Sequence, residues 1–233
     1  MKQEHTIKAV FFDLDGTLLY TLPDIARAVN YALEKNSLPA IPVEDYRDIV
    51  GWGLKVTIRK AVPSDIRDPG LLKKIRSEMK EAYARNPVVE TVPYPGVIEM
   101  LEAFREGGVP LGILSNKDDS LTRRIVATLL RDFSFVGVYG SSADVPPKPD
   151  TTGFNLLLEK TNLLPEQIMF VGDTAMDMEL ARTTGAFPLG VNWGYRSAEE
   201  LKEAGAAAIA GKPEDILNLF HQLSLDRGRD ALV

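Results

Sequence analysis

Two aspartates follow the first apolar segment of this sequence at a spacing that suits nucleophilic and acid–base chemistry. The chain reads DLDGT from Asp13 to Thr17, directly after an apolar run at residues 7–12. Asp13 and Asp15 are two residues apart, so in an extended backbone their side chains share a face, roughly 6–7 Å apart. One carboxylate could then attack a group while the other reaches its leaving atom. Gly16 permits a sharp turn, and Thr17 adds a hydroxyl that can bind a phosphate.

A second set of polar residues follows the apolar segment at residues 109–114. Ser115 and Asn116 offer a hydroxyl and an amide there, and both groups suit the binding of a phosphate. Further along the chain, Lys148 lies between two prolines, which restrict the local backbone. Its charge could orient Asp13 and neutralise an oxygen of a phosphoryl group.

Two more carboxylates follow the apolar segment at residues 167–171. Asp173 stands two residues after this segment, and Asp177 lies four residues further on. Because ligands of open α/β sheets bind beyond the carboxyl ends of the strands, we expect both to share one cleft with the first two aspartates. Four carboxylates in one cleft repel each other unless a cation lies among them. Ligands that are all oxygen favour Mg²⁺ over zinc or copper.

The composition excludes most cysteine and histidine chemistry. The 233 residues contain no cysteine, which rules out disulfides, cysteine nucleophiles and thiolate zinc sites. The two histidines, His5 and His221, lie near opposite ends of the chain, so a histidine triad or metal site would have to be built from one of them. Catalysis must therefore rely on carboxylates, hydroxyls, lysine, arginine and the backbone.

Charge and hydropathy argue against nucleic-acid and membrane partners. The net charge is −6 at pH 7 and the pI is about 5.1, which disfavours a general surface for polyanions. No apolar run approaches the roughly 18–20 residues of a membrane span. The first six residues lack the basic-then-apolar order of a signal peptide. We therefore predict a cytoplasmic protein, and we find no signal for its oligomeric state.

Strands and helices alternate along most of the chain, which predicts an α/β fold. After the first strand, residues 19–87 read as helices only, including an amphipathic segment at residues 43–61. We therefore expect a core domain formed by residues 1–18 and 88–233, with a helical domain inserted at residues 19–87. Alternating elements predict a parallel sheet with helices on both faces. The expected strands are residues 7–12, 109–114, 135–139, 167–171, 186–191 and 207–210.

These motifs, in this order, resemble the signatures of the haloacid dehalogenase superfamily of phosphotransferases. The helical insertion falls where that family places an α-helical cap, so the likeness covers nearly the whole chain. The resemblance implies a Rossmann-like core with an inserted cap domain. The likeness rests on the DLDGT motif, on Ser115-Asn116, on Lys148-Pro149, and on Gly172-Asp173 with Asp177.

The resemblance also implies a role for each carboxylate. The residue that matches Asp13 attacks phosphorus and forms an aspartyl-phosphate, and the match of Asp15 protonates the leaving oxygen and then activates water. In the family, Mg²⁺ is held by the matches of Asp13, of the Asp15 backbone carbonyl and of Asp173, with Asp177 in support. The expected catalytic residues are Asp13, Asp15 and Lys148, and the expected phosphate ligands are Thr17, Ser115, Asn116 and Lys148.

Within the superfamily, shorter motifs are similar to those of phosphoglycolate phosphatases. Tyr20, near the hinge into the cap, stands where those enzymes usually carry Asp. The resemblance implies hydrolysis of 2-phosphoglycolate, a small phosphorylated metabolite, to glycolate and phosphate. In the cap, Lys55 or Arg59 could meet a second anionic group of the substrate. The shorter motifs are LPDI at residues 22–25, AVN at residues 28–30, VGWGL at residues 50–54 and NWGY at residues 192–195.

Other activities stay open at this stage. Pyrophosphate, a sugar phosphate or a nucleotide could be the substrate of the same chemistry. A haloacid dehalogenase would not need Asp15, and a phosphomutase of similar sequence would carry a histidine in the cap. A phosphonoacetaldehyde hydrolase would need a cap lysine such as Lys35, Lys55 or Lys60. A response-regulator receiver would accept a phosphoryl group without turnover, and it would lack the large cap.

Overall fold

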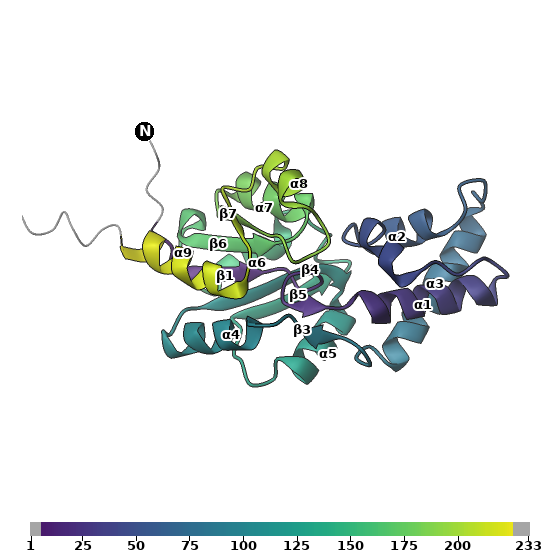
Figure 1. The fold of residues 1–233 in the computed structure, drawn as a ribbon, viewed down its shortest axis with the longest axis horizontal. Helices are drawn as coiled ribbons and strands as arrows, with labels where there is room; N and C mark the ends of the chain where they lie inside the picture. The colour runs from purple at the N-terminus through teal and green to yellow at the C-terminus, as the bar shows by residue number, and fades with distance from the viewer. Residues whose placement is uncertain (1–5, 226–233) are drawn as a thin grey trace, which may run out of the picture.

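A parallel sheet forms the core of the molecule, and a group of helices stands apart from it (Figure 1). The computed structural model describes residues 6–225, so His5 and residues 226–233 lie outside the described part. In spatial order the strands are β5 (Gly137–Ser141), β4 (Leu111–Asp118), β1 (Ala9–Phe12), β6 (Ile168–Gly172), β7 (Phe187–Val191) and β8 (Ala208–Ala210). All neighbouring pairs are parallel, and β1 lies at the centre, between β4 and β6.

The α/β fold that the alternating pattern predicts is confirmed. Most of the predicted helices and strands are present, with ends shifted by a few residues. Among residues 6–225, no helix combines the length and the apolar character that a membrane span requires. The helices around the sheet are α4 (Val97–Glu106), α5 (Asp119–Leu129), α6 (Thr152–Leu158), the short 3₁₀ helix η2 (Pro165–Gln167), α7 (Ala175–Thr184), α8 (Ala198–Glu203) and α9 (Pro213–Leu225).

β1 is buried on both faces because its alternate side chains enter two separate hydrophobic clusters. Phe12 points to the face covered by α4 and α9, where its ring lies 6.4 Å from that of Phe104. Phe11 points to the face covered by α6 and α7, where its ring lies 5.6 Å from that of Phe154. A strand with no exposed face must be almost continuously apolar. The first polar side chain after it, Asp13, therefore stands at the carboxyl end of the sheet.

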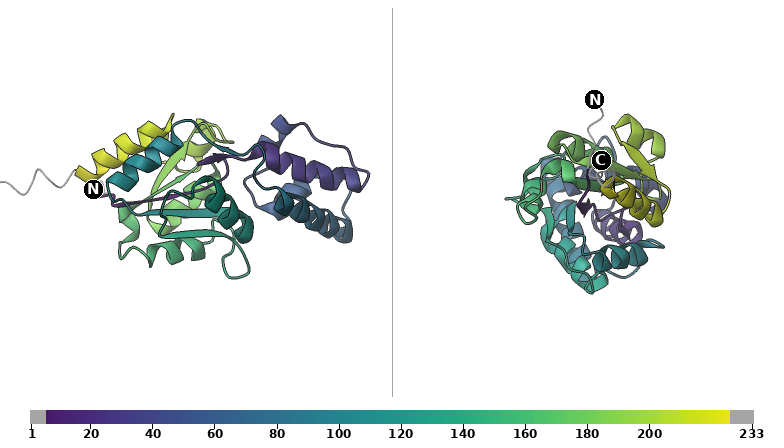
Figure 2. Two further views of the ribbon diagram at one scale, coloured as in Figure 1. Left: turned by 90° about the horizontal axis from the view of Figure 1, so that it is seen from below. Right: turned by 90° about the vertical axis from the view of Figure 1, so that its left-hand side faces the viewer.

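The cap is joined to the core by two paired segments. The chain enters it through β2 (Leu19–Tyr20) and leaves through β3 (Val92–Pro93), which pair antiparallel. Beside this pair, the N–H of Tyr94 donates to the carbonyl of Leu18 at 3.1 Å. We call these two segments, residues 18–20 and 92–94, the neck (Figure 2). The cap contains α1 (Leu22–Lys35), the 3₁₀ helix η1 (Val43–Asp48), α2 (Leu54–Ala61) and α3 (Pro69–Arg85).

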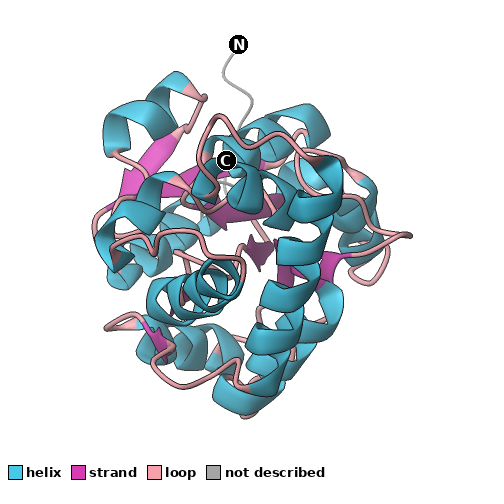
Figure 3. Cartoon of the chain, turned by 90° about the vertical axis from the view of Figure 1, so that its right-hand side faces the viewer, coloured by secondary structure: helices cyan, strands magenta, loops and turns pink. Residues whose placement is uncertain are grey.

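The helices of the cap lie over the carboxyl end of the sheet, as the view from the cap side shows (Figure 3). α1 packs along α3, and α2 packs against α3 and approaches β4. The domain boundaries after residues 18 and 87 stay a prediction.

One part of the predicted cap is wrong. The pattern at residues 43–61 predicts a single amphipathic segment, but the structure divides it into η1 and α2. Between them, Gly51 and Gly53 have φ angles of 102° and 80°, in the left-handed region that a right-handed helix cannot contain. The short strand β2 also lies where no strand was predicted, because two residues are too few to show a pattern.

A buried carboxylate fastens the two ends of the cap to each other. Asp24, in the first turn of α1, is fully buried and accepts hydrogen bonds of 2.9–3.2 Å from the N–H groups of residues 89–91. The hydroxyl of Thr91 donates to it at 2.6 Å, and Arg27 lies 2.8 Å away. Burial alone would raise the pKa of Asp24, but these hydrogen bonds outweigh burial and lower it.

Replacing Asp24 should destabilise the protein. In Asp24→Ala the N–H groups of residues 89–91 lose their acceptor, so we expect the free energy of unfolding at pH 7 to fall by about 3 kcal/mol. Urea unfolding measures this loss. Because the pKa of Asp24 is lowered from its ordinary 3.8, its contribution is present above that pH and is lost as the pH falls through the folded pKa. The exposed Glu90→Ala is the matched control, and an Asp24→Ala variant as stable as this control would contradict the role.

Candidate active site

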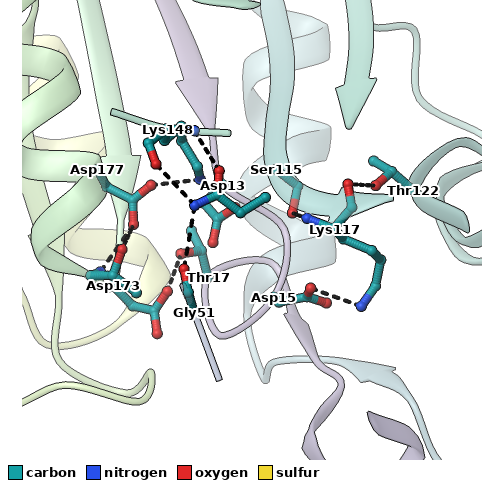
Figure 4. A network of polar contacts seen from close by, with 12 residues as sticks. Asp13, Asp15, Thr17, Gly51, Ser115, Lys117, Thr122, Lys148, Asp173 and Asp177 are labelled. Carbon is teal, nitrogen blue, oxygen red and sulfur yellow. Dashed lines mark hydrogen bonds and ion pairs between the residues drawn. The ribbon is translucent and has the colours of Figure 1, made fainter. Parts of the chain in front are cut away.

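Three carboxylates from the segments that follow two neighbouring strands meet at the carboxyl edge of the sheet (Figure 4). Asp13 follows β1, Asp173 follows β6, and Asp177 lies in the first turn of α7. One oxygen of each lies within 4.8 Å of the others, and all three side chains are buried. The chain leaves β1 toward β4 and leaves β6 toward β7. Such a point, where the connections diverge, is where open α/β sheets bind their ligands.

A buried lysine lies inside this cluster. The Nζ atom of Lys148 lies 2.7 Å from Oδ1 of Asp13 and 2.7 Å from Oδ1 of Asp177. Asn116 holds the backbone of this lysine, because its Oδ1 accepts from the N–H of Lys148 at 2.6 Å and its Nδ2 donates to the carbonyl at 3.3 Å. Burial alone would lower the pKa of Lys148, but the two carboxylates outweigh burial and raise the pKa above its usual value. The lysine is therefore charged.

The charges of this cluster do not balance within the protein. Three carboxylates against one ammonium leave two negative charges when all four groups are ionised. In the protein alone, burial above all raises the pKa of Asp13 to about 7 and raises the pKa of Asp173 well above its usual value. A deficit of two positive charges among oxygen ligands fits a Mg²⁺ ion. Asp13, Asp173 and Asp177 could hold it, and the contribution of the Asp15 carbonyl stays a prediction.

Asp173 is held by two donors and enclosed by a glycine. The hydroxyl of Thr17, which we predicted as a phosphate ligand, donates to Oδ1 of Asp173 at 3.2 Å. The N–H of Tyr195 donates to Oδ2 at 2.8 Å. Gly16 has a φ angle of 86°, and a Cβ atom there would collide with this carboxylate. The glycine of the DLDGT motif thus makes room for Asp173.

Asp177 both caps the first turn of a helix and pairs with the lysine. Its Oδ2 accepts hydrogen bonds from the N–H of Thr174 at 3.0 Å and from the hydroxyl of Thr174 at 2.6 Å. This arrangement caps the first turn of α7. It also fixes the side chain so that Oδ1 faces Lys148.

The polar residues after the second predicted strand lie where β4 is irregular. The sequence predicts that this strand ends at residue 114, but β4 continues to Asp118, with a shift of its register against β5 after Leu114. Such irregularities re-aim side chains near functional sites. Here Ser115, Asn116 and Lys117 all line a cavity, and the hydroxyl of Ser115 accepts from the N–H of Lys117 at 3.3 Å.

Sequence reasoning assigns no role to Lys117, which pairs with Asp15. Its Nζ lies 2.8 Å from Oδ2 of Asp15 and 4.7 Å from the ring centroid of Tyr83. Asp15 points away from the cluster around Asp13 (Figure 4). Burial alone would lower the pKa of Lys117, but Asp15 and Tyr83 together outweigh burial and raise the pKa above its usual value. A charged residue directly after two polar residues at a strand end is the signal that could have identified it.

The cavity lies between the core and the cap and has a volume of about 70 Å³. The cap contributes mostly apolar side chains, which would surround the part of a ligand that points away from the carboxylates. The core contributes nearly all of the charged groups. The lining residues from the cap are Ile25, Val50, Gly51, Gly53, Leu54, Thr57, Met79, Lys80 and Tyr83, and those from the core are Asp13, Asp15, Ser115, Asn116, Lys117, Asp118, Leu121 and Lys148.

The two cap cations that we predicted as substrate ligands are not brought to this cavity. Lys55 is exposed, and neither it nor Arg59 is among the lining residues. The guanidinium of Arg59 donates to the carbonyls of Ile66 and Ser64 at 2.7 and 3.2 Å. It therefore stabilises the turn between α2 and α3.

Two arginines cross from one part of the molecule to the other. Arg47 of the cap donates to the carbonyl of Gly194 at 2.6 Å. Arg196 of the core donates to the carbonyl of Val50 at 2.8 Å and to the carbonyl of Arg47. The residue between the two core positions, Tyr195, is the one whose N–H holds Asp173. The cap is thus fastened to the segment that positions a carboxylate of the cluster.

Comparison with known proteins agrees with this geometry. Residues 7–185 match the family model of the haloacid dehalogenase-like hydrolases. A phosphoglycolate phosphatase of Nitrosospira multiformis is 32% identical over 222 residues, which cover 94% of this chain and 97% of that protein.

Solved structures show the same similarity. A structure described as a predicted phosphoglycolate phosphatase from Haemophilus somnus is 29% identical, with a TM-score of 0.84, and the match covers 92% of this chain and 98% of that one. A haloacid dehalogenase-like family hydrolase from Streptococcus pneumoniae is 28% identical, with a TM-score of 0.82, and the match covers 92% and 99% of the two chains.

Mg²⁺ should stabilise the protein, and more so at high pH. Because the pKa of Asp13 is raised from 3.8 to about 7, the folded state binds more protons than the unfolded state in that window, and stability without the ion falls as the pH rises through it. Mg²⁺ replaces these protons. We expect saturating Mg²⁺ to raise the melting temperature by about 5 °C at pH 8 and by much less at pH 5. Thermal unfolding with Mg²⁺ or with EDTA measures the difference.

The matched variants are Asp173→Asn, which removes a charge from the cluster, and Asp144→Asn, which removes one from an exposed position. The first should lose most of the Mg²⁺ effect, and the second should keep it. Equal Mg²⁺ effects in both variants would contradict the metal site.

Proposed function

We propose that this chain, a phosphatase that belongs to the haloacid dehalogenase-like hydrolase family, uses Mg²⁺ to hydrolyse 2-phosphoglycolate to glycolate and phosphate. The proposal rests on the contacts that the two carboxylate oxygens of Asp13 make. Lys148 holds its Oδ1 at 2.7 Å, while its Oδ2 makes no hydrogen bond within residues 6–225 and the residue borders the cavity. A carboxylate that is fixed through one oxygen and open at the other is arranged to act as a nucleophile.

In the proposed reaction, Asp13 acts as the nucleophile and Asp15 as the acid and base. Oδ2 of Asp13 attacks phosphorus, the bond from phosphorus to the ester oxygen breaks, and Asp15 donates a proton to that oxygen, so that glycolate leaves. Asp13 then carries the phosphoryl group as a mixed anhydride. Asp15, now a carboxylate, takes a proton from a water molecule, whose oxygen attacks phosphorus. The bond to Asp13 breaks, phosphate leaves, and both aspartates return to their initial states.

The surrounding residues position the phosphoryl group and neutralise its charge. Lys148 reduces the repulsion between Asp13 and the anionic phosphoryl oxygens. Ser115 and Asn116 border the cavity, where a hydroxyl and an amide can donate to those oxygens. Mg²⁺ bound by the three carboxylates would polarise a phosphoryl oxygen and offset its negative charge. Thr17 contributes indirectly, because it orients Asp173.

Two observations support a small substrate. The relative from Nitrosospira multiformis is named a phosphoglycolate phosphatase. The cavity of about 70 Å³ is much smaller than the roughly 300–1,000 Å³ of pockets for drug-sized ligands, which disfavours nucleotides and sugar phosphates.

Tyr20, which departs from the phosphoglycolate phosphatase pattern, belongs to the neck and does not line the cavity. The cytoplasmic location stays a prediction.

A substrate panel tests the proposed function. Phosphate release would be measured with Mg²⁺ for 2-phosphoglycolate, pyrophosphate, a sugar phosphate and a nucleotide. We expect the highest kcat/KM for 2-phosphoglycolate and no release in EDTA. A higher kcat/KM for any other member of the panel would overturn the substrate, and release that persists after exhaustive chelation would overturn the metal.

Asp13→Asn should abolish turnover while the protein stays folded. An amide cannot form the mixed anhydride, and loss of a nucleophile costs several orders of magnitude in rate, so we expect a loss of about 1,000-fold or more. The steady-state rate measures it, and circular dichroism checks the fold. Asp144→Asn makes the same chemical change at an exposed position and should leave the rate unchanged. A variant of Asp13 that retains more than about a tenth of the activity would refute the assignment.

Asp15→Asn should slow the first step according to the leaving group. Without proton transfer, we expect single-turnover phosphorylation by 2-phosphoglycolate to slow by about 100- to 10,000-fold. p-Nitrophenyl phosphate should suffer far less, since its leaving oxygen needs little protonation. The phosphorylated enzyme should also accumulate, because the second step loses its base. An equal loss with both substrates would show that Asp15 is not the acid.

A further inference from the structure

A lysine and a tyrosine face the cavity with hydrogen-bonding capacity that the protein does not use. Lys117 carries three N–H donors on a side chain that is 5% exposed, and its acceptor within residues 6–225 is Oδ2 of Asp15. The hydroxyl of Tyr83, on α3, is buried and has no hydrogen-bond partner in the same part of the chain. It lies close to the same ammonium, whose Nζ is 4.7 Å from the centroid of the Tyr83 ring. Buried polar groups are hydrogen-bonded as a rule, so these groups point to a ligand.

We propose that Lys117 and Tyr83 bind a carboxylate carried by the leaving group of the substrate. The inference rests on the proposed phosphatase function and deepens it, because it defines the class of substrate as phosphate esters of small α-hydroxy acids. Lys117 supplies the charge from the core, and Tyr83 supplies a second donor from the neighbouring wall that the cap contributes.

The position of Lys117 relative to Asp15 selects this class. In 2-phosphoglycolate a single methylene carbon separates the ester oxygen from the carboxylate. A group that binds the carboxylate must therefore lie next to the group that protonates the ester oxygen. Lys117 satisfies this condition, since its Nζ lies 2.8 Å from the carboxyl of Asp15. The other oxygen of Asp15, Oδ1, is buried without a hydrogen-bond partner within the described residues, as expected for an oxygen that meets the substrate.

The other cations of the cavity are less suited to this task. Lys148 is already paired with Asp13 and Asp177. The side chain of Lys80 is 47% exposed and pairs with Asp118 at 2.6 Å, at the edge of the cavity. The two cap cations predicted from the sequence do not line the cavity.

The test compares two esters that differ only in the carboxylate. In 2-hydroxyethyl phosphate a hydroxymethyl group replaces the carboxylate of 2-phosphoglycolate. Both leaving groups are alkoxides, so any disturbance of Asp15 affects both esters alike and cancels in the ratio of their rates. The full-length protein with Mg²⁺ would be used, with the variants Lys117→Met, Lys117→Arg, Tyr83→Phe and, as a matched control, Lys80→Met.

We expect Lys117→Met to lower kcat/KM for 2-phosphoglycolate about 10- to 100-fold more than for 2-hydroxyethyl phosphate, as loss of a hydrogen bond to a charged group implies. The loss should appear mainly in KM, and Lys117→Arg should restore part of it. Tyr83→Phe should show the same preference at about 3- to 10-fold. Lys80→Met should change kcat/KM for the two esters by the same factor.

Each other outcome overturns a different claim. If the wild type hydrolyses neither ester, the proposed function is wrong and this inference falls with it. If the wild type is active but Lys117→Met and Tyr83→Phe lower both esters equally, the carboxylate site is wrong and the proposed function stands. If Lys80→Met alone discriminates between the esters, the carboxylate binds at Lys80. Should Lys117→Met fail to fold, Tyr83→Phe decides the question, because it removes one oxygen and keeps the buried ring.

Discussion

The ammonium of Lys148, buried between Asp13 and Asp177, is the contact on which the rest of the site depends. A charge this far from water is tolerated only when it is paired, and removal of one partner from such a pair leaves the other uncompensated. The pairing therefore fixes more than two side chains. Asn116 binds the backbone of the lysine to β4, and Asp177 caps α7 through Thr174. Together with the two ion pairs of Lys148, these contacts hold the ends of β4 and β1 and the start of α7 together at the sheet edge.

The core and the cap contribute different properties to the cavity. The core supplies charge, arranged around Asp13, whereas the cap supplies mainly apolar surface such as Leu54 and Met79. Apolar walls exclude water, and exclusion of water strengthens every electrostatic interaction inside. The crossing contacts of Arg47 and Arg196 hold these walls against the core. The chemistry that the core can perform therefore depends on where the cap lies.

The sequence predicts what local patterns determine and misses what depends on contacts between distant elements. Asp13 and Asp173 could be placed because each follows a buried strand, and parallel strands bring their carboxyl ends to one edge. The direction of Lys117 could not, because it depends on the irregular register of β4 against β5. Tyr83 reaches the cavity only through the packing of the cap. Arg59 does not reach the cavity, because its guanidinium donates to the carbonyls of Ile66 and Ser64 in a turn that the sequence pattern does not reveal.

The neck, where Leu18 and Tyr94 are joined by a hydrogen bond, makes the cap a loop whose two ends touch. For a flexible chain, the entropy cost of bringing the two ends of a loop together rises only slowly with the length of the loop. The sheet therefore does not require an insertion of one particular length or fold. A longer, shorter or differently folded segment could be joined at Leu18 and Tyr94 without displacing Asp13. Substrate choice can thus diverge between descendants of one ancestor while the nucleophile keeps its place at the end of β1.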